Sequence, residues 1–541
     1  YTFTPTSPSS VAPVTLSYTI EDDDGAESSA VATVSVTPYV APNDANVDVS
    51  ATLTSLLSRD RVDAEFAGNV SGGVVSDQGD VFAFSTYGSS GNDQEGGLWI
   101  FDGNTQSLTN VLPTDSEPAW AQGFSSDGSS LLVKTSQSIE GTTQTWSSQQ
   151  LSYVIDVASG AATHVSEFAD GSILNMNVST GDAAISADGT KVVFSAYVWD
   201  YDVSDNPTTG TAASYIDANR EGGAIESGNH IFVKDLVTGE LEVITDGPVV
   251  DYVDDYSISI SDDGSTVVFA ATPQQESVWD SSIGNHNVTY TLFNEEVSAG
   301  GQHVVTYDVG SGTFSSIGTT GSSSGVSPVI SGDGKYIVFT GDAGSWTSDV
   351  TGDQLLRYNT ETQAVDVVSS DANGVARGRG MYADVSADGR FIVFHGDGDP
   401  VAWSDWERDP DLPPDMTGGP TDARSYGSYL KDMVTGQVVY VGDSHDGSEL
   451  TESIQDAQIS ADGSVITFNS RADNLVPGDG DAGGNSNVFA QYNPFLPFSA
   501  NTIPSFDIAS SVVAENADGS VVGELSATDA DGEALTYTLT S

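Results

Sequence analysis

The stretch SADGSVITF, Ser460–Phe468, has six earlier versions in the same chain. In all seven, apolar and polar residues alternate around a four-residue segment that runs from a serine to a glycine, which we call the serine–glycine turn. Alternation on both sides of such a turn predicts a β-hairpin, in which glycine supplies the positive φ and serine or aspartate side chains bond the amides. The other versions are SDQGDVFAF from Ser76, SSDGSSLLV from Ser125, SADGTKVVF from Ser186, SDDGSTVVF from Ser261, SGDGKYIVF from Ser331 and SADGRFIVF from Ser386.

A second predicted hairpin follows each of the first six copies. Two hairpins give four strands per repeat, and four-stranded sheets repeated around an axis form a β-propeller, here with seven blades. The last copy is followed by a single strand, Ser486–Tyr492, and lacks its fourth. A spare strand, Ala51–Asp60, precedes the first copy, and we expect it to complete the last blade and close the ring. The second hairpins are LWIFDGNTQSLTNV, YVIDVASGAATHVS, IFVKDLVTGELEVIT, VVTYDVGSGTFSSIG, LLRYNTETQAVDVVS and YLKDMVTGQVVYVGD.

One segment also carries a resemblance to a known family. The segment ISADGSVITFNSRADNLVPGDGDAGGNSNVFAQY, Ile459–Tyr492, closely resembles the TolB-like, WD40-like (PD40-type) repeats of bacterial secreted and periplasmic proteins. The other copies match more loosely, and the resemblance extends over residues 51–495. It implies an all-β fold, a seven-bladed β-propeller, and leaves the function open because propellers host many activities.

The two ends of the chain resemble a second family. Two alternating stretches joined by an acidic turn, Val14–Val36, resemble the last strands of a bacterial cadherin-like (Ig-like) β-sandwich repeat. The AEN motif around Glu515 and the DAD motif of Asp529 and Asp531 resemble the first half of such a domain, whose matching carboxylates bind calcium. The expected division is 1–41 for part of one sandwich, 42–50 for a linker, 51–495 for the propeller, 496–504 for a second linker and 505–541 for part of another sandwich.

Neither flank reaches the about 100 residues of a complete sandwich. We therefore expect the chain to be a piece of a large secreted surface protein. The alternative is a fibre or surface layer, in which the tail of one chain completes the head of the next by strand complementation.

The charge of the chain limits its partners. Lysine and arginine number 15 against 78 aspartates and glutamates, a formal net charge of −63. Nucleic acid is excluded as a partner because phosphate backbones require basic residues, and anionic lipid is disfavoured for the same reason. The sequence has no apolar run of the about 18 residues that a membrane span needs. Cysteine is absent, which excludes disulfides and thiolate sites, and so acidic a surface suits a salty or calcium-rich extracellular medium.

Aromatic residues gather in three long connections, Ala196–Gly228, Ala270–Gly301 and His395–Ser428. Each joins the second and third strands of its repeat, so we expect all three on one face of the propeller. Exposed aromatic rings on loops above a rigid scaffold are typical of a recognition surface, here for a glycan or a protein. The alternative is that the rings pack the loops onto the blades. The candidate ligand-binding residues are Trp199, Tyr201, Trp279, Trp403 and Trp406 in these connections, with Trp346 in the equivalent, shorter connection of the fifth repeat.

Acidic loops form the second kind of candidate site. Asp479, Asp481 and Asn485 in PGDGDAGGN offer hard oxygen ligands at close spacing, which calcium prefers. With Glu515, Asp529 and Asp531 of the C-terminal flank, they form the predicted Ca²⁺ ligands. A solvated acidic turn is the alternative for the loop.

Sequences that match catalytic motifs occur without the secondary structure that such motifs need. The segment GSSSG, 321–325, is followed by a predicted strand and not by the helix that a nucleophile elbow needs. We therefore expect a module that is not an enzyme, with a structural or adhesive role at the bacterial cell surface. Two alternatives remain: a self-assembling fibre subunit, and a propeller-type polysaccharide lyase or hydrolase.

Overall fold

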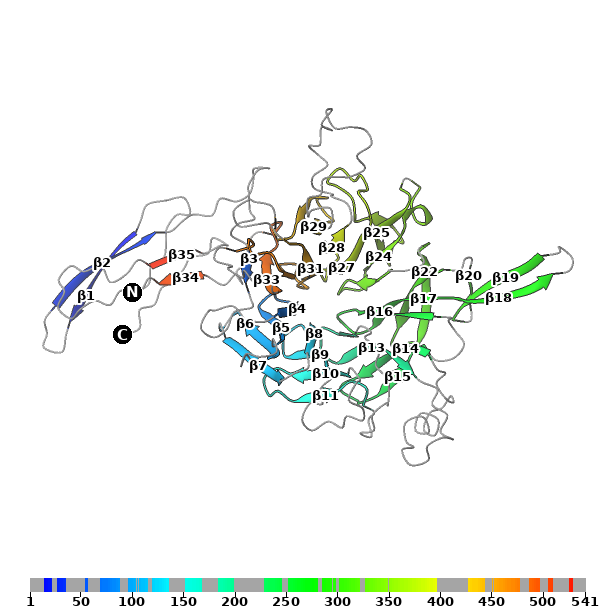
Figure 1. The fold of residues 1–541 in the computed structure, drawn as a ribbon, viewed down its shortest axis with the longest axis horizontal. Helices are drawn as coiled ribbons and strands as arrows, with labels where there is room; N and C mark the ends of the chain where they lie inside the picture. Colours follow the sequence, from blue (N-terminus) through cyan, green and yellow to red (C-terminus); the bar gives the residue numbers. More distant parts are fainter. Residues whose placement is uncertain are drawn as a thin grey trace, which may run out of the picture. The chain divides into compact units, whose positions relative to one another are not determined.

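The protein is described by a computed structural model, drawn in Figure 1. Two compact units divide the chain: residues 1–49 with 494–541, and residues 50–493. Among the described residues every element is a strand except one 3-10 turn, η2 (Ala343–Ser345), so the all-β prediction is confirmed. The described residues are 14–21, 27–35, 54–56, 69–87, 96–103, 105, 107–114, 119–135, 151–167, 183–198, 228–245, 252–280, 285–293, 295–297, 301–321, 326–348, 350–396, 427–442, 450, 452–476, 486–496, 505–508 and 525–528.

The first unit contains one four-stranded sheet built from both ends of the chain. Its order is β1 (Val14–Glu21), β2 (Glu27–Ser35), β35 (Leu525–Thr528) and β34 (Ser505–Ile508). The pair β1–β2 is the predicted N-terminal hairpin. Strand β2 runs parallel to β35, a long-range pairing that the local pattern gives no means to predict.

In the second unit, the described strands form seven antiparallel four-stranded sheets that follow one another along the chain. Each begins with the hairpin around a serine–glycine turn, as predicted. The sheets are β4 (Asn69–Val75), β5 (Val81–Tyr87), β6 (Gly96–Asp102), β7 (Ser107–Thr114); β8 (Ala119–Phe124), β9 (Ser130–Thr135), β10 (Leu151–Asp156), β11 (Ala162–His164); β12 (Ala183–Ile185), β13 (Lys191–Val198), β14 (Gly228–Asp235), β15 (Leu241–Val243); β16 (Tyr252–Ile260), β17 (Thr266–Thr272), β21 (His303–Asp308), β22 (Thr313–Thr319); β23 (Val329–Ile330), β24 (Tyr336–Asp342), β25 (Asp353–Asn359), β26 (Val365–Val367); β27 (Gly380–Val385), β28 (Phe391–Gly396), β29 (Gly427–Asp432), β30 (Val438–Tyr440); and β31 (Ile454–Ile459), β32 (Val465–Ser470), β33 (Asn487–Tyr492), β3 (Thr54–Leu56).

The last of these sheets takes its fourth strand from the other end of the unit. Strand β3 pairs antiparallel with β33, with Thr54 opposite Gln491 and Leu56 opposite Phe489. The spare N-terminal strand therefore lies where the sequence analysis expected it.

The serine–glycine turns explain their own composition. In the last copy, the amide of Val465 donates to Ser460 Oγ at 3.0 Å, and this hydroxyl donates to Asp462 Oδ1 at 2.6 Å. Gly463 has a φ of 75°, in the left-handed region that glycine enters without strain. In the first copy Gln78 replaces the aspartate, and Ser76 donates instead to Asp80 at 2.8 Å.

Backbone hydrogen bonds link the turns of successive sheets. Six such bonds run in sequence order from the second turn to the seventh, and the last of them joins the seventh turn to the first. The bonds run from Ser126 N to Ala187 O (2.7 Å), Ala187 N to Asp262 O (3.0 Å), Asp262 N to Gly332 O (3.0 Å), Asp333 N to Ala387 O (2.9 Å), Ala387 N to Ala461 O (2.7 Å) and Asp462 N to Asp77 O (3.1 Å).

The core lies between neighbouring sheets. One cluster joins Leu98 of the first sheet to Leu131 of the second, and another joins Phe84 of the first sheet to Val465 and Val488 of the last. The phenylalanines five residues after the turn glycines are all buried, as their alternation predicts. They are Phe84, Phe194, Phe269, Phe339, Phe394 and Phe468.

The long connections join the predicted strand pairs, β13 to β14, β17 to β21 and β28 to β29. The second connection contains a three-stranded antiparallel ribbon of β18 (Gln274–Asp280), β19 (Asn285–Leu292) and β20 (Glu295–Val297), which the sequence analysis did not predict. Figure 1 shows the β18–β19 hairpin projecting away from the four-stranded sheets. The described residues include no helix with the length and hydropathy of a membrane span.

Candidate ligand-binding pocket

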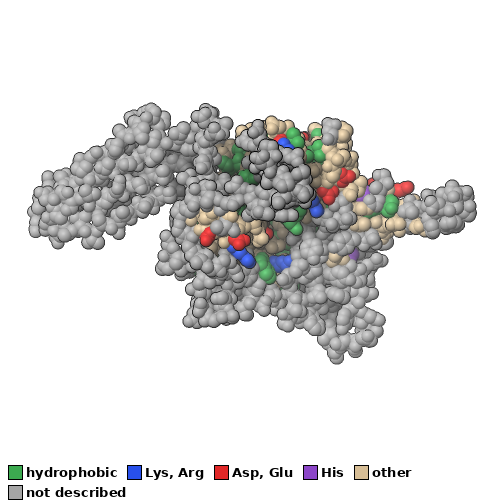
Figure 2. All heavy atoms as spheres, turned by 45° about the horizontal axis from the view of Figure 1, so that its top comes forward, with side chains coloured by type: hydrophobic (Ala, Val, Ile, Leu, Met, Phe, Trp, Pro, Cys, Tyr) green, Lys and Arg blue, Asp and Glu red, His purple; other side chains and the backbone are tan. Residues whose placement is uncertain are grey.

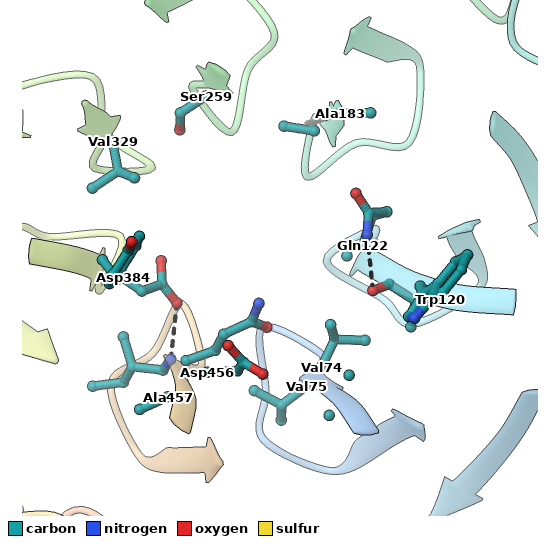
Figure 3. A pocket seen from close by; sticks show the side chains of 18 of the residues that line it. Val74, Val75, Trp120, Gln122, Ala183, Ser259, Val329, Asp384, Asp456 and Ala457 are labelled. Carbon is teal, nitrogen blue, oxygen red and sulfur yellow. Dashed lines mark hydrogen bonds between the residues drawn. The ribbon is translucent and has the colours of Figure 1, made fainter. Parts of the chain in front are cut away.

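A pocket of about 730 Å³ lies at the centre of the second unit. Each of the seven four-stranded sheets lines it with its first strand or the residues just before that strand. In Figure 3, Asp384 and Asp456 lie on one side of the pocket, and Trp120 and Gln122 lie across it. Side chains that are about 300 residues apart in sequence therefore face one space.

The lining combines aromatic, amide and acidic groups. Trp120 is half-buried, whereas Tyr382 is 70% exposed. Gln122 Nε2 donates to the carbonyl of Ala121 at 3.3 Å, which leaves its amide oxygen available as an acceptor. Asp456 is exposed, and its Oδ2 accepts a hydrogen bond from Asn469 Nδ2 at 2.9 Å.

Asp384 is the less exposed of the two acids that line the pocket. Its carboxylate accepts from the amides of Val385 and Ile459, each at 2.9 Å. Burial raises the pKa of Asp384 to about 6, and these two hydrogen bonds oppose that rise. Lys134, with 8% of its surface exposed, is the cation among the described lining residues.

Further acids lie in the serine–glycine turns. Burial, with the charges of Asp262 and Asp462, raises the pKa of Asp77 to about 6. Burial also raises the pKa of Asp262, whose carboxylate lies so close to Gly332 that an added Cβ there would be 2.0 Å from Asp262 Oδ2. A side chain at the second position of the fifth turn would therefore require the Asp262 carboxylate to move.

The structure places two of the predicted ligand-binding aromatics on described elements. Trp346 is half-buried, with its ring centroid 5.1 Å from Phe339 and 6.0 Å from Tyr358, so it packs on the fifth sheet. Trp279 lies on β18, in register with His286. Trp346 is not among the residues that line the central pocket. Trp199, Tyr201, Trp403 and Trp406 lie outside the described residues.

The predicted calcium ligands also lie outside the described part of the chain. These residues are Asp479, Asp481, Asn485, Glu515, Asp529 and Asp531. Within the described ranges, no three His, Cys, Asp or Glu side chains come together as a metal site.

The sequence analysis missed the pocket residues Trp120, Gln122, Tyr382, Asp384 and Asp456. They stand between five and eight residues before the turn glycine of their own copy. Alignment of the seven copies on that glycine would have placed all five residues within the same four-residue stretch of the first strands.

Comparison with known proteins bears on the fold alone. No protein-family profile and no curated protein sequence matches the chain. Among solved structures, TolB from Acinetobacter baumannii is 14% identical, with a TM-score of 0.33 and coverage of 78% of this chain and 79% of its own. The β-propeller domain of the Trilobed protease from Pyrococcus furiosus is 11% identical, with a TM-score of 0.42 and coverage of 74% and 89%. The arrangement typical of a β-propeller comes from the structure itself, in the consecutive four-stranded sheets of residues 50–493 and the backbone bonds between their turns.

The similar structures also include an enzyme. Oligogalacturonate lyase from Vibrio parahaemolyticus is 13% identical, with a TM-score of 0.39 and coverage of 89% of this chain and 98% of its own. The expectation that this chain is not an enzyme, drawn from its missing catalytic motifs, is not supported, because enzymes are among the similar structures. So distant a similarity says nothing about which reaction, if any, this chain catalyses.

Proposed function

We propose that residues 50–493 are a closed seven-bladed propeller that binds a neutral oligosaccharide in its central pocket. The observation that carries this proposal is the lining, in which Trp120 and Tyr382 share one space with Gln122, Asp384 and Asp456. Binding pockets combine apolar surface with a few polar groups that fix the orientation of the ligand.

The closed ring is supported by the contacts between its last and first sheets. The bond from Asp462 N to Asp77 O and the cluster of Phe84 with Val465 both join these two sheets. Strand β3 covers the edge of β33, so the ring has the N-terminal strand closure expected of it.

A carbohydrate matches the chemistry of this lining. The faces of a sugar ring carry C–H groups that pack on aromatic rings such as Trp120 and Tyr382, and its hydroxyls both donate and accept hydrogen bonds. The carboxylate of Asp456 accepts from hydroxyls, whereas the amide of Gln122 can do both.

The charge favours a neutral sugar over a uronate. The described lining has two carboxylates, Asp384 and Asp456, against the single cation Lys134. The whole chain has a net charge of −63, and Figure 2 shows acidic and basic side chains interspersed on the described part of one face. A uronate would therefore meet like charge in the pocket and little compensation around it.

We propose the same setting that the sequence suggested, a large bacterial surface protein whose propeller binds surface glycans outside the cell. Pairing of β2 with β35 in a single chain supports a self-contained flanking unit over a fibre assembled head to tail. Calcium held by Asp479, Asp481 and the C-terminal flank remains part of this proposal.

Isothermal titration calorimetry with cellohexaose, laminarihexaose, chitohexaose and hexagalacturonate tests the function. We expect at least one neutral oligosaccharide to bind and hexagalacturonate to bind more weakly. Trp120→Ala should lower the affinity about tenfold or more. Chromatography of the same mixtures detects cleavage. Absence of binding by all four sugars would overturn the proposal.

A further inference from the structure

Three lining residues of the pocket have left-handed backbone. Ser327, Tyr382 and Asp456 have φ values of 38°, 51° and 51°. Each stands seven residues before the turn glycine of its copy, and the three copies are consecutive. They therefore form one continuous arc of the pocket wall.

This conformation is unfavourable for residues with a side chain. A Cβ atom crowds the backbone at positive φ, so glycine is the usual residue there, and an aromatic residue is a clear outlier. The equivalent residue of the first copy is Gly72, with a φ of 70°, and a Cβ added there would have no neighbour within 4 Å. The fold thus accepts glycine at this position.

Packing does not explain the strained backbone of Tyr382 and Asp456. Tyr382 is 70% exposed and Asp456 is exposed as well. Register shifts in β27 and β31, between Met381 and Asp384 and between Gln455 and Gln458, mark β-bulges at this level. Bulges beside functional sites redirect side chains, and backbone strain concentrates at such sites.

We infer that Tyr382, Asp456 and Ser327 contact the ligand directly. Their side chains are needed for binding, so these positions have residues other than glycine although the backbone there is strained. Tyr382 stacks on a sugar ring, and Asp456 and Ser327 bond its hydroxyls. This inference rests on the proposed function. The space beside Gly72, which follows Asp456 around the ring, gives the ligand room at the end of the arc.

Replacement by glycine separates binding from stability, because it removes the side chain and the strain together. We expect Tyr382→Gly to keep or raise the Tm and to weaken binding of the preferred neutral hexasaccharide about tenfold. Tyr382→Phe should retain most of the affinity, since it keeps the ring. Asp456→Gly should also weaken binding, but it removes the hydrogen bond with the buried Asn469, so its Tm does not test the inference.

Gln363 provides the matched control. It has a φ of 60° in the exposed turn between β25 and β26, where other sheets have Gly160, Gly239 or Gly436. Gln363→Gly should keep or raise the Tm and leave the affinity unchanged.

The outcomes are distinguishable by calorimetry and thermal melting. If the unmodified protein binds none of the four sugars, the proposed function falls and this inference falls with it. If it binds a sugar, and Tyr382→Gly and Asp456→Gly bind equally well, the inference alone is wrong. A lower Tm for Tyr382→Gly than for Gln363→Gly would also overturn it, because the tyrosine side chain would then serve the fold.

Discussion

Asp384 in β27 accepts a hydrogen bond at 2.9 Å from the backbone amide of Ile459 in β31, so one side chain joins the innermost strands of neighbouring sheets. Ser259 in β16 makes the equivalent connection, accepting from the amide of Ile330 at 3.3 Å. Both residues stand five positions before their turn glycine. The wall of the pocket is thus held together by the side chains that line it.

Removal of the Asp384 carboxyl should therefore destabilise the propeller. At pH 5, a carboxyl with a pKa of about 6 is mostly uncharged, so the lost hydrogen bonds decide the effect. We expect Asp384→Ala to lower the free energy of unfolding by about 1–3 kcal/mol, because two buried amides lose their acceptor. Asp384→Asn, which keeps a carbonyl oxygen, should lose less. Urea denaturation measures both, and equal stability of the alanine variant and the unmodified protein would contradict the prediction.

Asp77 should make stability depend on pH in the opposite sense to most acids. Its pKa is about 6 in the folded protein and 3.8 as the ordinary value, so the folded state binds more protons between these pH values. Stability should fall as the pH rises from about 4 to 6 and then stay level. Asp77→Asn should reduce this dependence, with the share of Asp384 remaining, and be more stable at pH 7 by on the order of 1 kcal/mol after solvent screening. Parallel pH slopes for the two proteins would refute the prediction.

Lys431 is a buried cation that holds two sheets together. Its Nζ donates to the carbonyls of Ser370 at 2.7 Å and Asp371 at 3.2 Å, and burial lowers its pKa. Lys431→Met should lower the free energy of unfolding by about 1–3 kcal/mol, because the carbonyl of Ser370 loses the ammonium donor and that of Asp371 keeps only the amide of Gly374. Lys335→Met is the control, since the ion pair of Lys335 with Asp333 is at the surface and should contribute little. Chemical denaturation that ranks the two variants equally would count against this role.

Calcium should stabilise the protein if the predicted ligands bind it. We expect a chelator to lower the Tm, because an ion bound to the folded state alone shifts unfolding by mass action. Asp479→Asn with Asp481→Asn should remove the contribution of the loop, and Glu515→Gln that of the C-terminal flank. Differential scanning calorimetry with and without chelator checks this. An unchanged Tm on calcium removal would show that both predicted sites are wrong.

The strand content and the hairpins could be predicted because their causes are local. Ser460, Asp462 and Gly463 bond within a few residues of one another, and the alternation that buries Phe468 spans one hairpin. Repetition of this pattern then gave the number of repeats, and the missing last strand pointed to β3.

The pocket and the first unit depended on tertiary structure. Trp120 and Asp456 lie across one cavity because the sheets bring their first strands together, and no local pattern encodes that proximity. The left-handed backbone of Tyr382 opposes the preference of its residue type, so local rules predict the wrong conformation there. The parallel pairing of β2 with β35 joins segments from opposite ends of the chain. Short-range chemistry determined the turns and strands of this protein, whereas contacts between distant segments determined which residues line the central pocket.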